Sequence, residues 1–134
     1  MAEVSVSRFV HATPAELEAF LTPAMLVECE GSFAVRETRE TSEGVVVLAD
    51  GGGMEIELAF EPREKGLRYE QRRGPLERLE TAFSYRSENE GSRVELRSTV
   101  ATGTPPRAIT DRVAAWKRRG ELRRALSSVA AELE

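Results

Sequence analysis

The residues best suited to chemistry in this sequence are polar side chains on two neighbouring segments of alternating character. Tyr69, Gln71 and Arg73 are spaced two residues apart on one segment, and Thr81 and Tyr85 lie on the next. Residues two apart on a strand share a face, so these side chains could project together into one interior. A tyrosine hydroxyl could then donate to a carbonyl or enolate oxygen, and an arginine could stabilise its negative charge.

Each of these residues also has a structural interpretation. Tyr69 and Tyr85 can be amphipathic core residues whose hydroxyls reach solvent or a local partner. Arg73, which precedes Gly74-Pro75, can be a solvated charge at the rim of a sheet. The residues alone therefore assign no catalytic group, and whether the protein is an enzyme stays open.

The other reactive side chains favour structural roles. Nothing in the sequence points to an activated thiol at Cys29, which we interpret as a small buried hydrophobic residue. Glu28 and Glu30 flank it, but residues two apart on a helix diverge rather than converge. One cysteine rules out an internal disulfide, and a single histidine, His11, argues against a histidine-based metal site. We expect no metal and no cofactor.

Composition and charge narrow the class of protein. Of the 134 residues, 40% are hydrophobic and 31% charged, as in a globular chain, and no apolar run approaches the roughly 20 residues of a membrane helix. The first residues lack the basic and apolar regions of a signal peptide, so we expect a cytoplasmic protein without integral membrane association. The net charge of −4 gives no general argument for nucleic acid, and we expect no nucleic-acid partner.

Basic residues nevertheless gather near the C-terminus. Residues 107–134 hold seven basic and four acidic residues, including Lys117-Arg118-Arg119 and Arg123-Arg124. Such clusters could contact RNA or anionic lipid. Because we expect no aromatic residue on the same face, we interpret them as the solvated outer surface of a helix.

Helices and strands alternate in an order that must position these residues. Residues 3–12 predict a strand, and Thr13-Pro14-Ala15-Glu16 and Thr22-Pro23 each predict the start of a short helix. Residues 32–102 then alternate with period two over about six strands, whose short connecting turns require antiparallel pairing. A long helix is predicted from Pro106, with an apolar stripe from Ile109 through Trp116 to Leu133 that we expect to cover the sheet.

This order resembles the START-like helix-grip superfamily (SRPBCC), and within it the polyketide cyclase/dehydrase and lipid-transport group. The resemblance covers essentially the whole chain. It is carried by Arg8-Phe9-Val10-His11-Ala12-Thr13-Pro14 leading into Leu17 and Phe20-Leu21-Thr22, by Glu30-Gly31-Ser32-Phe33, and by Thr110-Asp111-Arg112 with Ala115-Trp116.

The resemblance implies one α+β domain over residues 1–134. Its fold would be a curved antiparallel sheet of about seven strands, ordered strand, two helices, six strands, helix, around the long C-terminal helix. It also implies a deep pocket between sheet and helix for small hydrophobic or aromatic molecules, a property that does not by itself make a protein an enzyme.

We therefore expect a monomer or homodimer that binds a small hydrophobic, aromatic or lipid-like molecule. The alternatives are a polyketide cyclase- or dehydratase-like enzyme that uses polar pocket residues, and a protein-interaction module. The period-two count and the helical stripe predict a pocket lined by large apolar residues with two polar ones, and with a glycine opposite its opening: Phe33, Met54, Phe60, Tyr69, Gln71, Phe83, Trp116 and Gly120.

Overall fold

Seven antiparallel strands form one sheet in the order β1-β7-β6-β5-β4-β3-β2 in the computed structural model, which describes residues 1–134. Each strand from β2 onward pairs with the strand that follows it in sequence, and β1 pairs with β7. The elements are β1 (Ala2–Val10), α1 (Pro14–Phe20), α2 (Pro23–Glu30), β2 (Ala34–Thr41), β3 (Gly44–Gly51), β4 (Met54–Arg63), β5 (Gly66–Arg73), β6 (Arg78–Glu88), β7 (Gly91–Ala101) and α3 (Arg107–Leu133). The predicted α+β order is confirmed.

The two short helices begin where their capping residues predict. The side chain of Thr13 accepts a hydrogen bond from the Glu16 amide, and the Glu16 carboxylate accepts one from the Thr13 amide. Thr22 caps α2 through the Met25 amide. The helix ends at Gly31, whose φ of 81° lies in the left-handed region that favours glycine.

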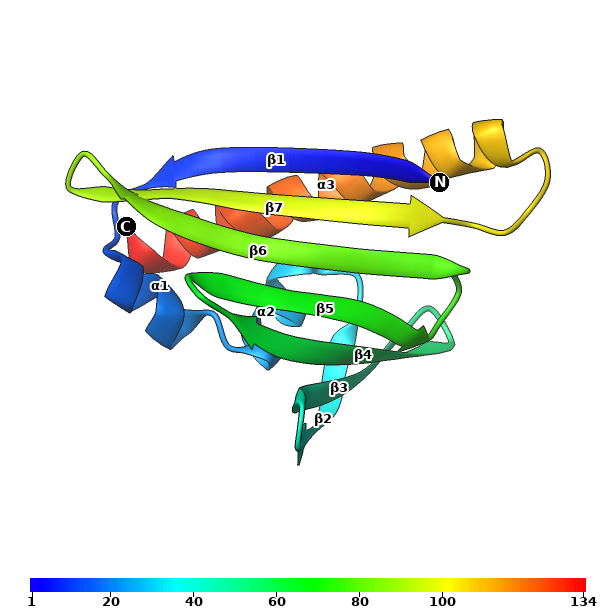
Figure 1. Cartoon of the computed structure of the whole chain (residues 1–134), viewed down its shortest axis with the longest axis horizontal. Helices are drawn as coiled ribbons and strands as arrows, with labels where there is room; N and C mark the ends of the chain where they lie inside the picture. The colour runs from blue at the N-terminus through cyan, green and yellow to red at the C-terminus, as the bar shows by residue number, and fades with distance from the viewer.

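The helices cover one face of the sheet, and the sheet bends around them (Figure 1). The long helix α3 packs chiefly on β1 and β7 and against α2, which in turn contacts β2 and β3. The helix therefore lies over one edge of the sheet, and α2 closes the space toward the other edge. None of the three helices has the length and apolar character of a membrane span.

The inward face of the sheet is built in rows of cross-strand neighbours. One apolar row joins Leu96 on β7 to Phe83 on β6 and Leu67 on β5. The next row is polar and joins Ser98, Thr81 and Tyr69 in the same strands. The polar row lies beneath Arg118 of α3, whose side chain contacts all three residues of that row.

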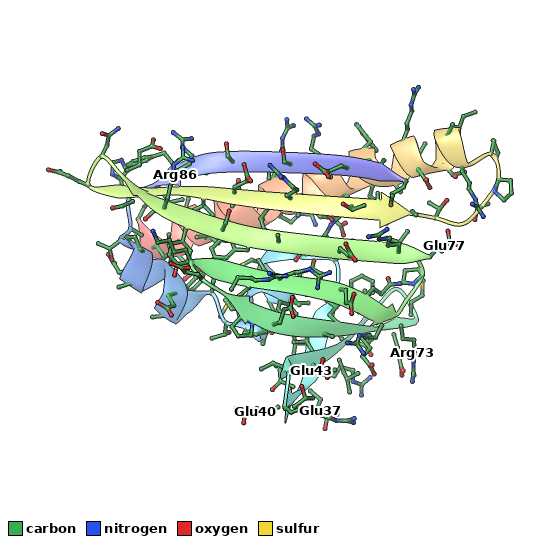
Figure 2. The ribbon with its side chains drawn as sticks, viewed as in Figure 1. Glu37, Glu40, Glu43, Arg73, Glu77 and Arg86 are labelled. Atoms are coloured by element: carbon green, nitrogen blue, oxygen red, sulfur yellow. The ribbon has the colours of Figure 1, made fainter.

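Charged side chains alternate with these rows and project from the outer face (Figure 2). Arg68 on β5, for example, lies between carboxylates of the neighbouring strands, 3.4 Å from Glu61 on β4 and 3.2 Å from Glu80 on β6. Exposed pairs of this kind contribute little stability each. They mark the outer face as the solvated one, as the alternation in the sequence predicts.

Candidate functional site

A cavity of about 390 Å³ lies between the N-terminal half of α3 and the middle of the sheet. Ile56 and Leu58 on β4 form its sheet wall, together with Leu79 on β6 and Val100 on β7. Its helix wall includes Ala114 and its opposite wall Val27. These residues make the cavity mainly apolar.

The exposed lining residues of the cavity lie at the end of the sheet where β5 and β7 end and β4 and β6 begin. Its lining there includes Gly52 from the turn before β4, Pro75 from the β5–β6 connection, and Lys117 from α3. All three residues are exposed, and the side chain of Met54 beside them is 43% exposed. A ligand would therefore enter between α3 and these two loops.

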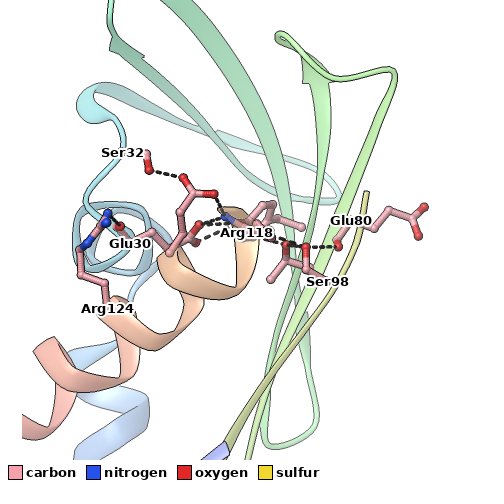
Figure 3. A network of polar contacts seen from close by, with 9 residues as sticks. Glu30, Ser32, Glu80, Ser98, Arg118 and Arg124 are labelled. Atoms are coloured by element: carbon pink, nitrogen blue, oxygen red, sulfur yellow. Dashed lines mark hydrogen bonds and ion pairs between the residues drawn. The ribbon is translucent and has the colours of Figure 1, made fainter. Parts of the chain in front are cut away.

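A buried polar cluster closes the inner end of the cavity (Figure 3). Arg118 extends from α3 onto the polar row of the sheet, where its Nε donates to Ser98 Oγ at 3.1 Å and its Nη2 to Thr81 Oγ1 at 2.8 Å and to the Tyr69 hydroxyl. Its Nη1 forms an ion pair with Glu30 at the end of α2 and lies 3.4 Å from Glu121. We call these six residues the Arg118 cluster.

The cluster uses all of the hydrogen-bonding capacity of its cation. A guanidinium has five N–H donors, and each donor of Arg118 has an acceptor within the protein. The Tyr69 hydroxyl in turn donates to the Glu30 carboxylate, 2.8 Å from Oε2. Ser32 donates to Glu121, and Arg124 donates to the Glu30 carbonyl at 2.9 Å, so the surrounding groups are held as well.

Electrostatics keep Arg118 charged and Tyr69 neutral. Burial alone would lower the pKa of Arg118, but the carboxylate of Glu30 raises it above the ordinary value, and the guanidinium stays charged. Burial raises the pKa of Tyr69, an effect that the nearby Arg118 only partly opposes, so its hydroxyl stays protonated. Neither group is poised to exchange a proton near neutral pH.

Gln71 presents the one buried side-chain oxygen or nitrogen without a hydrogen-bond partner, its Oε1 atom. Its amide nitrogen donates to the Leu76 carbonyl at 2.6 Å, which fixes the side chain against the β5–β6 connection. A Cβ on Gly74 would lie 2.4 Å from Oε1, so the glycine leaves room for this arrangement. Gln71 lines the cavity, but its Oε1 atom is fully buried against Gly74 and is not exposed to the cavity.

The structure brings four of the eight predicted pocket residues together in the cavity lining, namely Phe33, Met54, Tyr69 and Gln71. Phe60 and Phe83 face inward as predicted but lie outside that lining. Phe60 continues the row of Tyr69 onto β4, and Phe83 belongs to the apolar row beyond it. The rings of Phe60 and Tyr69 pack with centroids 4.7 Å apart. Whether the lining residues bind a ligand stays a prediction.

The predicted positions of Trp116 and Gly120 are wrong. Trp116 is 78% exposed, and Gly120 is exposed with no atom within 4 Å of the position its Cβ would take. Both residues lie on the side of α3 that faces away from the sheet, since Arg118 and Leu122 occupy the sheet side. Gly120 therefore leaves no room for a ligand.

Sequence reasoning missed the role of Arg118, which it placed with the solvated basic residues. The signal was present: Arg118, Leu122, Ala125 and Val129 repeat at helical spacing, and the last three are apolar. Their shared face places Arg118 over the sheet. Glu30 had no comparable signal, because its partner lies far away in the sequence.

The Arg73 and Tyr85 side chains lie away from the cavity. Arg73 is exposed at the end of β5, as the solvated interpretation predicts, and Figure 2 shows it at the rim of the sheet. Tyr85 is half-buried beside Phe83, with ring centroids 5.8 Å apart. Of the five polar residues that opened the sequence argument, Tyr69 and Gln71 line the cavity, and Thr81 contributes to its closed end through Arg118.

Comparison with known proteins identifies the fold. No protein-family model and no curated protein matches the chain. Among solved structures, the chain is similar to a START superfamily protein from Mycobacterium smegmatis, with 14% identity over 98% of this chain and 99% of that chain and a TM-score of 0.75. It is also similar to ginseng major latex-like protein 151 from Panax ginseng, with 11% identity, coverage of 98% and 97%, and a TM-score of 0.73.

A third structure, TTHA0849 from Thermus thermophilus, has 19% identity, with coverage of 95% of this chain and 99% of that chain and a TM-score of 0.65. At sequence identities this low, the similarity supports a shared fold but not a shared binding site. The matches span 95–98% of this chain, so they include its seven-stranded antiparallel sheet and α3. The chain thus has the helix-grip fold of START-like proteins.

Proposed function

We propose that the protein binds a small, mainly apolar molecule in the cavity beneath α3. The observation that carries the proposal is a mainly apolar cavity of about 390 Å³ between α3 and the sheet, with exposed residues at its mouth. Binding sites for small molecules are typically of about 300–1,000 Å³, with a few polar groups among apolar walls. The volume and the lining both fit that description.

The Arg118 cluster supports binding rather than proton transfer. Every N–H group of Arg118 is used within the protein, and the Tyr69 hydroxyl already donates to Glu30. Binding a substrate oxygen at Arg118 would require breaking one of these buried contacts, which is costly. The cluster therefore serves as a fixed inner wall, and the ligand is held by shape.

The lining also indicates the chemistry of the ligand. Its walls are mainly apolar, so a bound molecule gains affinity chiefly by burying apolar surface there. Lys117 at the opening is exposed and can approach an anionic or strongly polar end. An aromatic or lipid-like molecule with a polar end at the mouth fits this arrangement.

The test is a fluorescence titration with N-phenyl-1-naphthylamine, an uncharged aromatic probe that carries one N–H group. Ala114→Phe places a large ring in the cavity from the helix side and should lower probe affinity about tenfold or more by filling the space. Gly120→Leu on the outer side of the same helix is the matched control, and it should leave affinity unchanged.

Native mass spectrometry of the purified protein gives an independent measurement, the mass of any small molecule that copurifies. Circular dichroism establishes that both variants are folded before the titrations are compared. A folded Ala114→Phe variant that binds the probe like the parent would remove the proposal, because the probe would then lie elsewhere.

A further inference from the structure

The outer side of the N-terminal half of α3 carries an apolar stripe that no part of the chain covers. Ile109 is 62% exposed, Val113 is 60% exposed, and Trp116 is 78% exposed. Spacings of four and three residues place the three side chains in one line along the helix. We call these three residues the outer stripe.

Unpaired basic residues border the outer stripe. Arg112, Lys117, Arg119 and Arg123 are exposed, and none of them forms an ion pair. The two acidic residues of this part of the helix point the other way: Asp111 is buried and accepts from the Thr102 amide, and Glu121 is paired with Arg118. The exposed charged residues in this part of α3 are therefore all basic.

We propose that the outer stripe docks the protein on a membrane surface that contains anionic lipids. A helix with tryptophan and aliphatic residues on one side and basic residues beside them lies well at such a surface, with its apolar side chains at the acyl boundary. The basic residues gain from the negative potential of the headgroups. The sequence argument against such a surface depended on an aromatic-free basic face, and Trp116 lies on that face.

Two other partners fit the stripe less well. In a symmetric dimer that places stripe against stripe, the basic borders of the two copies would repel each other. Three such side chains also bury on the order of 500 Å², below the about 800 Å² per partner of a standard interface. A single-stranded RNA would stack bases on Trp116, but Ile109 and Val113 offer it no stacking surface.

The stripe and the cavity lie on different sides of the N-terminal half of α3, because neighbouring helical residues point about 100° apart. Ala114 and Lys117 line the cavity, and their sequence neighbours Val113 and Trp116 belong to the stripe. Docking itself requires only the outer stripe and its basic border.

The test uses the single tryptophan as a local reporter, because Trp116 is the only one in the chain. Vesicles of phosphatidylcholine with about 30 mol % phosphatidylglycerol should shift its emission to the blue, protect it from acrylamide, and cosediment with the protein. Vesicles of phosphatidylcholine alone should do so at least tenfold less well. Raising the salt from about 0.1 M to about 0.5 M should weaken binding to the anionic vesicles.

Two variants and two controls test whether vesicle binding depends on the outer stripe and its basic border. Trp116→Ala and Arg119→Glu should each lower the vesicle partition coefficient about tenfold or more in cosedimentation. Arg86→Glu is the matched charge control, because Arg86 is exposed at the far end of β6 (Figure 2). It should bind like the parent, and so should Ala114→Phe, which separates this proposal from the cavity proposal.

Three outcomes would overturn the proposal. The first is an unshifted Trp116 emission with anionic vesicles. The second is a shift that grows with protein concentration alone, together with a dimeric mass by light scattering, which would assign the stripe to a second copy. The third is a shift with single-stranded RNA but not with vesicles.

Discussion

The two halves of α3 differ in which residues they bury and which they expose to solvent. In the C-terminal half, the buried residues are all apolar and lock the helix onto β1 and α2: Leu122, Ala125, Leu126, Val129 and Ala130. In the N-terminal half, the buried residues are the charged Asp111 and Arg118, and large apolar side chains face solvent. The C-terminal half therefore supplies stability, and the N-terminal half leaves space for a cavity on one side and offers a surface on the other.

The variant with the largest expected effect removes the positive charge of Arg118 from the N-terminal half of α3. Arg118→Met keeps the side-chain stem but leaves Glu30 as a buried, unpaired carboxylate, and it should cost about 3–5 kcal/mol of unfolding free energy in a denaturant titration. Arg119→Met, one residue along and exposed, should change stability by less than about 0.5 kcal/mol. Equal losses in the two variants would contradict the buried cluster.

A second test compares apolar side chains from the two halves. Leu126→Ala removes a fully packed side chain from the C-terminal half and should cost about 2–5 kcal/mol. Trp116→Ala removes a larger side chain but an exposed one, and it should change the free energy of unfolding by less than about 0.5 kcal/mol. A loss of several kcal/mol for Trp116→Ala would mean that the outer stripe is covered in solution.

The smallest effect concerns the thiol of Cys29 on α2. Burial raises its pKa from an ordinary 9.0 to about 11, with the carboxylates of Glu132 and Glu28 adding to the shift. The folded state favours the neutral thiol, so this contribution to stability is present below pH 9 and is lost as the pH rises toward about 11. Cys29→Ala should remove that part of the pH dependence in denaturant titrations.

Thiol reactivity provides a direct readout of the same residue. Because the thiolate is the reactive form, a thiol reagent should modify Cys29 slowly at about pH 8 and much faster once denaturant unfolds the chain. Rapid modification of the native protein at the same pH would show that the structure around the buried Cys29 opens readily.

The sequence predicted the sheet well because its signals are local. In β4 the buried Ile56, Leu58 and Phe60 alternate with less buried residues, mostly glutamates, and this alternation defines an inward face without knowledge of any other strand. The capping box at Thr13 predicts the start of α1 for the same reason. Both predictions are confirmed.

The helix stripe failed because two stripes were treated as one. Ile109, Val113 and Trp116 follow the helical repeat among themselves, as do Leu122, Leu126 and Val129. Six residues separate Trp116 from Leu122, about one and two-thirds turns, so the two sets lie on different sides of the helix. The extent of the cavity depends on how far α3 stands from β4 and β5, a distance that no local pattern contains.

The polar row of the sheet has a consequence for how the chain finds its fold. Ser98, Thr81 and Tyr69 meet Arg118 because each faces inward in the native register. A slip of β6 by one residue would turn Thr81 to the outer face and bring charged Glu80 or apolar Ala82 inward in its place. Arg118 would then lose acceptors that no water replaces in the interior, so the cluster selects one strand alignment among those that the apolar rows alone would tolerate.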